Sequence, residues 1–332
     1  MRVRNTLLPV YLLPVYLLHT SLALSSVSTK VAIIGTTGKL GREAIQQLSK
    51  QGIGTRCLLR HDVSSVTPPT SLEEAESSAQ VAAFLKTLPG VEMVQGDVLN
   101  KESLQDLVKD TTACLALYGP VVPKPFFKAL VPLWFPESDA KHPKQVNYEG
   151  IKSLLAVLAD SPTCKHLVRI TGKGENPWSI FSILINAFGG IAKGWNYEAE
   201  QLIRNSPIAY TILRPGVMKH SVGDDATTLG IKDNGGDLKV SAVSYAQIAD
   251  LAIQVVTRDN CKRSTLTAMN VEANDGQGSQ TLDQVQPDTR DFPDSLLAEH
   301  KTAARVGGLS IIFIALIIVK AIATLLGSLL GF

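Results

Sequence analysis

The chain has 332 residues, 45% of them hydrophobic, and its 32 Lys and Arg residues balance 30 Asp and Glu residues to a formal net charge of +2. The charges are scattered without a block of one sign, so the sequence gives no electrostatic case for a nucleic-acid partner. The four cysteines form no CxxC pair and the six histidines have no paired-ligand spacing, which excludes the usual metal-site and disulfide-framework patterns.

Residues 1–25 have the layout of a signal or targeting segment. Arg2 and Arg4 precede an apolar run from Leu7 to Leu18, and Ser21-Leu-Ala23 offers a cleavage site. Two prolines in the run argue against a stable spanning helix. The segment predicts either the endoplasmic reticulum and secretory route or, in algae with complex plastids, the first half of a plastid address. A disordered leader, or one that only dips into the membrane, is the alternative.

From residue 30 to about 270, short β-branched runs alternate with helical stretches, which is typical of a parallel sheet with crossover helices. We therefore expect one α/β domain with a Rossmann-type, doubly wound parallel sheet. The expected strands are Lys30–Gly35, Thr55–Arg60, Glu92–Gly96, Ala113–Tyr118, His166–Thr171, Ala209–Arg214 and Thr265–Met269. The expected helices are Leu40–Gln51, Lys101–Val108, Val146–Asp160, Asn196–Asn205 and Ser244–Thr257, with an extra one near Gln80–Leu88.

One connection carries a concentration of aromatic residues and prolines. It runs from Gly119 to Pro143, after the fourth expected strand. An open α/β sheet places substrate or lid loops at that point, and an aromatic loop packed against a membrane is an equally good interpretation.

The most informative segment is KVAIIGTTGKLGREAIQQL, in which a buried strand leads directly into a glycine loop and then into an amphipathic helix. Gly35 permits a tight turn, Gly38 lets the backbone approach a pyrophosphate, and Gly41 allows close packing of the helix. The phosphates would lie on the helix N-terminus. This order of strand, loop and helix predicts a dinucleotide site.

The spacing GxxGxxG, the strands HLVRITG and YTILRPG, and Glu200 resemble the atypical short-chain dehydrogenase/reductase family with an NmrA-like NAD(P)-binding domain. The segment Val146–Leu155 looks like the helix before the fifth strand of that family. The resemblance implies three groups of cofactor contacts. They are Gly35, Thr36, Thr37, Gly38, Lys39, Leu40 and Gly41 at the pyrophosphate, Asp97 and Val98 at the adenine, and Pro215, Gly216 and Val217 at the nicotinamide.

The end of the second strand bears on the choice of cofactor. An NAD-preferring site would place an acidic residue against the ribose 2′-hydroxyl, whereas this chain has Arg60, which suits a 2′-phosphate. The expected cofactor is therefore NADP, with NAD as the alternative because Asp62 is close by.

No catalytic residue is assigned. Tyr148 and Lys152 match a Tyr-x-x-x-Lys spacing, but they precede the fifth strand, whereas the pair of the family follows it. Counted back from Glu200, the family positions hold Ala192 and Asn196. Lys193 and Tyr197 are the substitutes that a shifted register would offer.

The last part of the chain predicts a membrane attachment. Residues 271–304 are polar and are expected to form a linker, and residues 306–332 are apolar enough for a transmembrane helix. Lys320 inside this stretch would snorkel, pair with a partner helix or mark a break. Lys301 and Arg305 beside it favour a cytosolic or stromal domain.

Two functions remain open. The first is a membrane-anchored NAD(P)H-dependent oxidoreductase whose aromatic segment covers an apolar substrate. The second is a catalytically silent NADP(H)-binding redox sensor or assembly factor that acts on a membrane protein partner. The expected partners are a nicotinamide dinucleotide and the lipid bilayer, without nucleic acid or metal.

Overall fold

The structure is a computed structural model that describes residues 30–119, 135–222, 227–272 and 279–330. The expected signal segment 1–25 and residues 120–134 of the aromatic connection lie outside the described residues.

An eight-stranded sheet forms the centre of the protein, with the strand order β3-β2-β1-β4-β5-β6-β10-β8. Neighbouring strands are parallel except for the antiparallel pair of β8 and β10. The strands are β1 (Lys30–Ile34), β2 (Gly54–Leu59), β3 (Val91–Gln95), β4 (Thr111–Ala116), β5 (His166–Ile170), β6 (Ala209–Pro215), β8 (Thr227–Lys232) and β10 (Ser264–Glu272). The predicted Rossmann-type sheet is confirmed.

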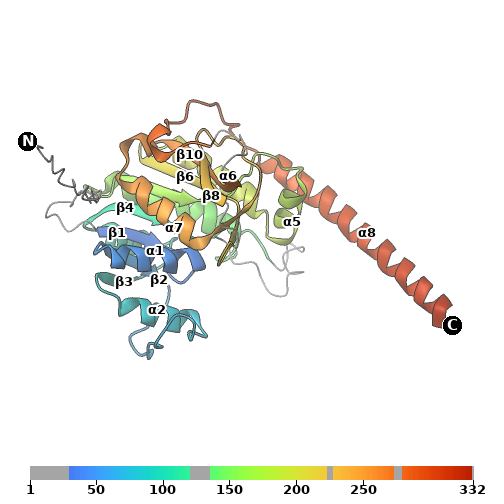
Figure 1. Cartoon of the computed structure of the whole chain (residues 1–332), viewed down its shortest axis with the longest axis horizontal. Helices are drawn as coiled ribbons and strands as arrows, with labels where there is room; N and C mark the ends of the chain where they lie inside the picture. Colours follow the sequence, from blue (N-terminus) through green and yellow to red (C-terminus); the bar gives the residue numbers. More distant parts are fainter. Residues whose placement is uncertain (1–29, 120–134, 223–226, 273–278, 331–332) are drawn as a thin grey trace, which may run out of the picture.

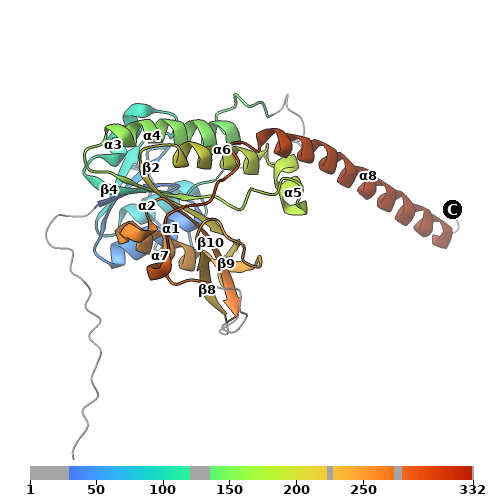
Figure 2. The same ribbon diagram turned by 90° about the horizontal axis from the view of Figure 1, so that it is seen from above.

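Helices cover both faces of the sheet (Figure 1 and Figure 2). One face carries α1 (Lys39–Lys50), α2 (Ser78–Lys86) and α7 (Tyr245–Gln254), and the other carries α3 (Lys101–Val108), α4 (Gly150–Asp160) and α6 (Ala192–Arg204). A separate apolar core fills each side of the sheet. The chain order reverses between β1 and β4, so the crevice at their carboxyl ends is the expected binding place.

Several elements differ from the expectations. The short strands β7 (Val217–Lys219) and β9 (Ala242–Ser244) pair with each other, and β8 adds an edge to the main sheet. Three-residue strands carry too little alternation to be seen in a sequence. Helix α5 (Ile180–Phe188) was also not expected, because its run of apolar residues has no amphipathic pattern facing a core.

The polar stretch before the last helix is attached to the domain. We call residues 279–296 the C-terminal strap. Asp288 accepts hydrogen bonds from the Thr265 backbone and hydroxyl and from the Tyr210 hydroxyl. The carbonyl of Pro293 accepts hydrogen bonds from Tyr197 and Gln201 at 2.7 Å each. A polar composition indicates a linker, but these pairings depend on tertiary partners that the composition does not reveal.

Helix α8 (Leu297–Leu330) begins within the expected linker and continues through Lys320 without a break. Among the described residues it is the helix long and apolar enough to cross a membrane, and only 6% of its most apolar window is buried in the protein. Its first turns are fixed to the domain, because Lys301 pairs with Glu137 at 2.8 Å and the His300 ring is fully buried. The rest of the helix extends away from the domain (Figure 1).

A buried ionic cluster holds the strap side of the domain together. The Glu200 carboxylate on α6 accepts hydrogen bonds from Arg214, Arg204 and Thr171. Arg214 also pairs with Glu175 at 2.6 Å. Burial opposes the ionisation of Glu200, but Arg214 and Arg204 outweigh it and lower the pKa of that carboxyl to about 2. The cluster therefore stabilises the fold only while Glu200 is charged.

We predict that Glu200→Gln lowers the free energy of unfolding by about 3–5 kcal/mol, because it leaves a buried guanidinium without its main counter-charge. In the wild-type protein, the contribution of Glu200 is complete above pH 4.5 and is lost as the pH falls toward about 2. Denaturant titration of the full chain in detergent at neutral and acidic pH measures both effects. The exposed Glu76→Gln variant is the control, and equal stabilities of the two variants would contradict the prediction.

Candidate nucleotide-binding site

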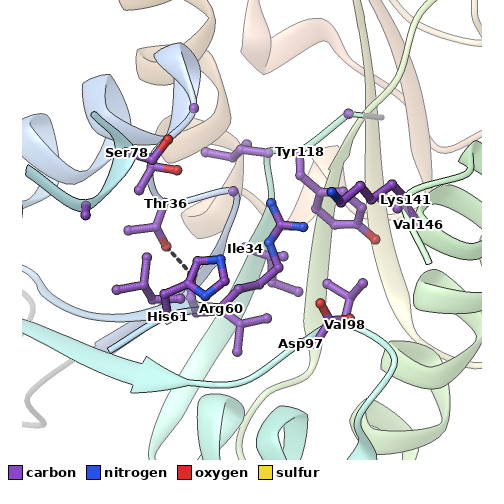
Figure 3. Close-up of a pocket in the computed structure, with 18 of the residues that line it drawn as sticks. Ile34, Thr36, Arg60, His61, Ser78, Asp97, Val98, Tyr118, Lys141 and Val146 are labelled. Carbon is purple, nitrogen blue, oxygen red and sulfur yellow. Dashed lines mark hydrogen bonds between the residues drawn. The ribbon is translucent and has the colours of Figure 1, made fainter. Parts of the chain in front are cut away.

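A cavity of about 310 Å³ opens at the carboxyl edge of the sheet, where β1, β2 and β4 end (Figure 3). Its lining comes from the glycine loop, the ends of β2 and β4, the turn after β3, and two connecting segments. The lining residues are Ile34, Gly35, Thr36, Thr37, Gly38, Leu58, Leu59, Arg60, His61, Val63, Ser78, Ala79, Asp97, Val98, Leu117, Tyr118, Gly119, Ala140, Lys141 and Val146. The cavity lies at the topological switch point that the strand order predicts.

The glycine loop needs the absence of a side chain at two positions. Gly35 has a φ of +100°, and a Cβ there would lie 2.7 Å from the Leu117 carbonyl oxygen. A Cβ on Gly41 would lie 2.1 Å from the Gly35 carbonyl oxygen. Gly38 is the N-cap of α1, and its amide donates to the Gly35 carbonyl at 3.0 Å. The loop therefore leaves the helix N-terminus uncovered for a phosphate group.

The other residues of the loop divide into two groups. Thr36 and Thr37 line the cavity, and the Thr36 hydroxyl donates to the Leu58 carbonyl at 2.7 Å, which ties the loop to β2. Lys39 and Leu40 start α1 and are not among the lining residues. Leu40 is buried, and the Lys39 ammonium lies 5.7 Å from the centre of the Tyr245 ring. These two side chains therefore pack against the protein and do not line the cavity.

Arg60 is exposed and lines the cavity at the end of β2. It forms no ion pair with any described residue. Asp62 is absent from the lining, and its carboxylate accepts hydrogen bonds from the Ser64 backbone at 2.9 Å and the Ser64 hydroxyl at 2.6 Å. The cation is thus available to a ligand, while the neighbouring carboxylate is engaged elsewhere.

Asp97 and Val98 line the cavity at the turn after β3. The Ser103 hydroxyl contacts both the amide and the carbonyl of Asp97, at 3.2 and 3.1 Å, and the Asp97 carboxylate accepts the Leu99 amide at 3.0 Å. Val98 packs closely on Gly150, because a Cβ added to Gly150 would lie 2.9 Å from the Val98 side chain. These contacts fix the turn after β3 in place.

Pro215, Gly216 and Val217 are not part of the cavity lining. They lie at the carboxyl end of β6, three strands from β1, or about 14 Å at the usual strand spacing. The Gly216 amide donates to Ala268 and the Val217 amide to Ser241. Contact of a nicotinamide with these three residues stays a prediction, because the cavity lining does not contain them.

Four polar side chains in the lining were not expected from the sequence: His61, Ser78, Tyr118 and Lys141. The sequence could have indicated Tyr118, because it comes two residues after β4, the strand beside the switch point. Ser78 and Lys141 come from long connections, where composition indicates neither an element nor a site. Lys141 adds a second cation to Arg60 in the lining, and a phosphate-rich ligand is stabilised by such cations.

Beside the cavity, Arg169 is fully buried among neutral acceptors. Its guanidinium donates to the carbonyls of Ala116 and Tyr118 and to the side-chain oxygens of Asn147 and Asn196. It also lies 4.2 Å from the centre of the Tyr118 ring. Burial raises the pKa of the Tyr118 hydroxyl, and Arg169 only partly offsets this rise. The phenol is therefore held neutral.

The structure does not bring a Tyr–Lys pair to the cavity. Ala192 is buried at the start of α6, and Asn196 is a hydrogen-bond acceptor for Arg169. Tyr197 donates to the Pro293 carbonyl, and the Lys193 ammonium donates to the Lys173 carbonyl at 2.7 Å. Burial, and then the charge of Arg214, lower the pKa of Lys193 to about 8.

The Tyr-x-x-x-Lys match of Tyr148 and Lys152 is also not part of the cavity lining. The Tyr148 ring packs against Trp195, with ring centres 5.6 Å apart, and Lys152 is exposed on α4. Within the described ranges there is also no group of three or more His, Cys, Asp or Glu residues suited to a metal. Among the described residues, neither Tyr197 with Lys193 nor Tyr148 with Lys152 therefore places a proton donor in the cavity lining.

A family of NAD(P)H-binding proteins matches residues 35–259, most of this chain. The chain belongs to this family and binds a nicotinamide dinucleotide through a Rossmann-type domain. The expected NAD(P)-binding domain is confirmed.

The chloroplastic protein TIC 62 is similar to this chain in three plants. The protein from Pisum sativum is 22% identical over 222 residues, covering 67% of this chain and 39% of that protein. The one from Oryza sativa is 26% identical over 231 residues, covering 68% and 44%. The chain therefore matches less than half the length of these relatives.

Solved structures support the fold alone. A short-chain dehydrogenase/reductase from Veillonella parvula in complex with NADP has a TM-score of 0.52 at 11% identity, covering 75% of this chain and 96% of that one. The anaerobilin reductase ChuY from Escherichia coli O157:H7 has a TM-score of 0.52 at 14% identity, covering 74% and 98%. Both neighbours are reductases by name, and they share the Rossmann-type fold of this chain.

Replacing Gly41 tests the loop geometry. We predict that Gly41→Ala abolishes dinucleotide binding and lowers the melting temperature, because the new methyl group would collide with the Gly35 carbonyl. Gly54→Ala is the matched control, since its Cβ would meet only the Lys30 side chain, at 3.0 Å, at the other end of β2. Fluorescence titration with NADPH measures binding. Wild-type affinity in Gly41→Ala would contradict the loop assignment.

Asn196 tests whether the family lysine position can be restored. We predict that Asn196→Lys destabilises the protein by on the order of 3 kcal/mol, because it sets a second cation against buried Arg169. Asn196→Asp keeps the acceptor and adds a counter-charge, so it should be the more stable variant of the two. Thermal unfolding measures the difference, and a reversed order would show that Asn196 does not hold Arg169.

Proposed function

We propose that the protein is a membrane-anchored, NADP(H)-preferring member of its family, acting in a plastid. The observation that carries the cofactor preference is Arg60, an exposed guanidinium in the cavity without an ion pair to any described residue, beside an Asp62 carboxylate engaged by Ser64. A 2′-phosphate would supply the missing counter-charge. The pyrophosphate is assigned to the loop from Gly35 to Gly41.

Two further observations support the proposed location. Helix α8 supplies the anchor, by length and composition. The relatives in Pisum sativum and Arabidopsis thaliana are chloroplastic proteins, and of the two expected addresses this favours the plastid over the endoplasmic reticulum.

The second candidate function is a catalytically silent sensor or assembly factor that binds NADP(H). It is favoured by Asn196 and Ala192, since one holds Arg169 and the other is buried. An oxidoreductase would need a proton donor other than the usual tyrosine. Slow oxidation of bound NADPH by a panel of carbonyl and quinone acceptors would favour the enzyme, and no turnover with intact binding would favour the sensor.

The cofactor preference has a direct test. We predict that Arg60→Ala weakens NADPH binding about 10-fold or more and leaves NADH binding nearly unchanged, because only NADPH carries the phosphate that pairs with the guanidinium. Lys50→Ala, at the exposed far end of α1, is the control. Titrations of the full chain in detergent with both nucleotides measure the ratio. An equal loss of affinity for both would contradict the role of Arg60.

A further inference from the structure

The polarity of α5 is inverted relative to a helix on a water-soluble domain. Its buried residues are Ser182 and Asn186. Large apolar side chains lie on the outside: Ile180 is 64% exposed, Phe181 57% and Ile185 44%. An amphipathic surface helix normally buries its apolar stripe and exposes its polar face. The outer face of α5 is therefore suited to contact with something other than water.

The polar inner face of α5 is fully used by the domain. Asn186 hydrogen-bonds to the His300 ring at 2.8 Å and accepts the Lys193 amide at 2.9 Å. Ser182 accepts from the Lys193 ammonium at 3.3 Å. These buried polar contacts fix the rotation of α5 about its axis, so the helix cannot turn its apolar face inward without leaving them unpaired.

Helix α5 also lies directly against the start of the apolar part of α8 (Figure 2). A Cβ on Gly307 would lie 2.7 Å from Ile183, and one on Gly308 would lie 3.0 Å from Ala187. The two glycines thus let side chains of α5 pack against the backbone of α8. Just beyond this contact, α8 carries Leu309 and Phe313, which are 68% and 65% exposed. The exposed face of α5 therefore continues into the exposed apolar surface of the candidate span.

We propose that α5, with Trp178 just before it, lies in the interfacial layer of the same bilayer that α8 spans. The proposal rests on the membrane anchoring proposed above. Continuity with α8 identifies the lipid as the occupant, because a bilayer that surrounds α8 beyond Gly308 also reaches the outer face of a helix packed on Gly307 and Gly308. Trp178 is 54% exposed at the end of this face, and tryptophan is enriched at membrane–water interfaces.

This arrangement has a consequence for the nucleotide site. The Gly174 carbonyl, four residues after β5, accepts a hydrogen bond from His300 of α8 at 2.7 Å. Hence α5, the base of α8 and the cavity are all at the carboxyl edge of the sheet. Two attachments, one spanning and one interfacial, hold the domain in a fixed orientation with this edge toward the membrane.

A fluorescent probe of polarity tests the proposal. The four native cysteines are buried, so a cysteine introduced on the surface is the one that a maleimide reaches. The full chain, reconstituted in phosphatidylcholine vesicles, is labelled with an environment-sensitive dye at Phe181→Cys or Ile185→Cys. Leu316→Cys on α8 reports the span, and Val240→Cys, an exposed apolar position away from α5, is the matched control. Lipids that carry a quencher on the acyl chain are then added to the vesicles.

We expect blue-shifted emission and quenching by the lipid at 181, 185 and 316, with neither at 240. If 316 is quenched while 181 and 185 report water, the anchor stands and the interfacial role of α5 is overturned. A blue shift at 181 and 185 without quenching by the lipid would mean that protein covers this face, either residues 120–134 or a second copy, and it also overturns the proposal. Absence of quenching at 316 would refute the anchoring and this inference together.

Discussion

The close approach of the first turn of α1 to the end of β1 is the constraint on which the site depends. Gly41 lies against the Gly35 carbonyl with no space for a side chain, and Gly35 lies against the Leu117 carbonyl at the end of β4 in the same way. These backbone contacts place the α1 N-terminus over the crevice between β1 and β4. The helix dipole and the free amides of that turn then favour an anionic group there. The assignment of the cavity to a dinucleotide depends on this placement of the helix N-terminus.

A second constraint is the treatment of charge near the cavity. Glu200 pairs with Arg214 and Arg204, Glu175 pairs with Arg214 and Arg290, and the terminal nitrogens of Arg169 donate to neutral acceptors. Arg60 differs from them, because it is exposed to the cavity and has no such partner among the residues that the structure describes. Because Arg60 lies in the binding crevice, an anionic group of the ligand is the counter-charge that we expect for it.

The sequence predicted the elements whose signal is local. The strands β1, β4, β5 and β6 are almost entirely buried, and the glycine loop has the order of strand, turn and helix that the chemistry requires. Arg60 was identifiable from its place at the end of β2. Tyr118 could have been found by the same reasoning. Ser78 and Lys141 could not, because long connections bring them to the cavity.

The remaining differences have tertiary causes. Helix α5 buries Ser182 and Asn186 because Lys193 and His300 meet them there, and the strap is held by Asp288 and Pro293 through partners far away in the sequence. No local pattern encodes such pairings. The start of α8 at Leu297 has the same explanation, since its first turns are polar and are stabilised by burial of His300 and by the pair of Lys301 with Glu137.

Hydrogen–deuterium exchange of the full chain, with and without saturating NADPH, tests the central claim most directly. The account predicts that NADPH slows exchange in the loop from Gly35 to Gly41, around Arg60, and in the turn at Asp97 and Val98, because these amides border the bound dinucleotide. Protection confined to other parts of the chain, or no protection at a concentration that saturates binding, would contradict the assignment of this cavity as the cofactor site.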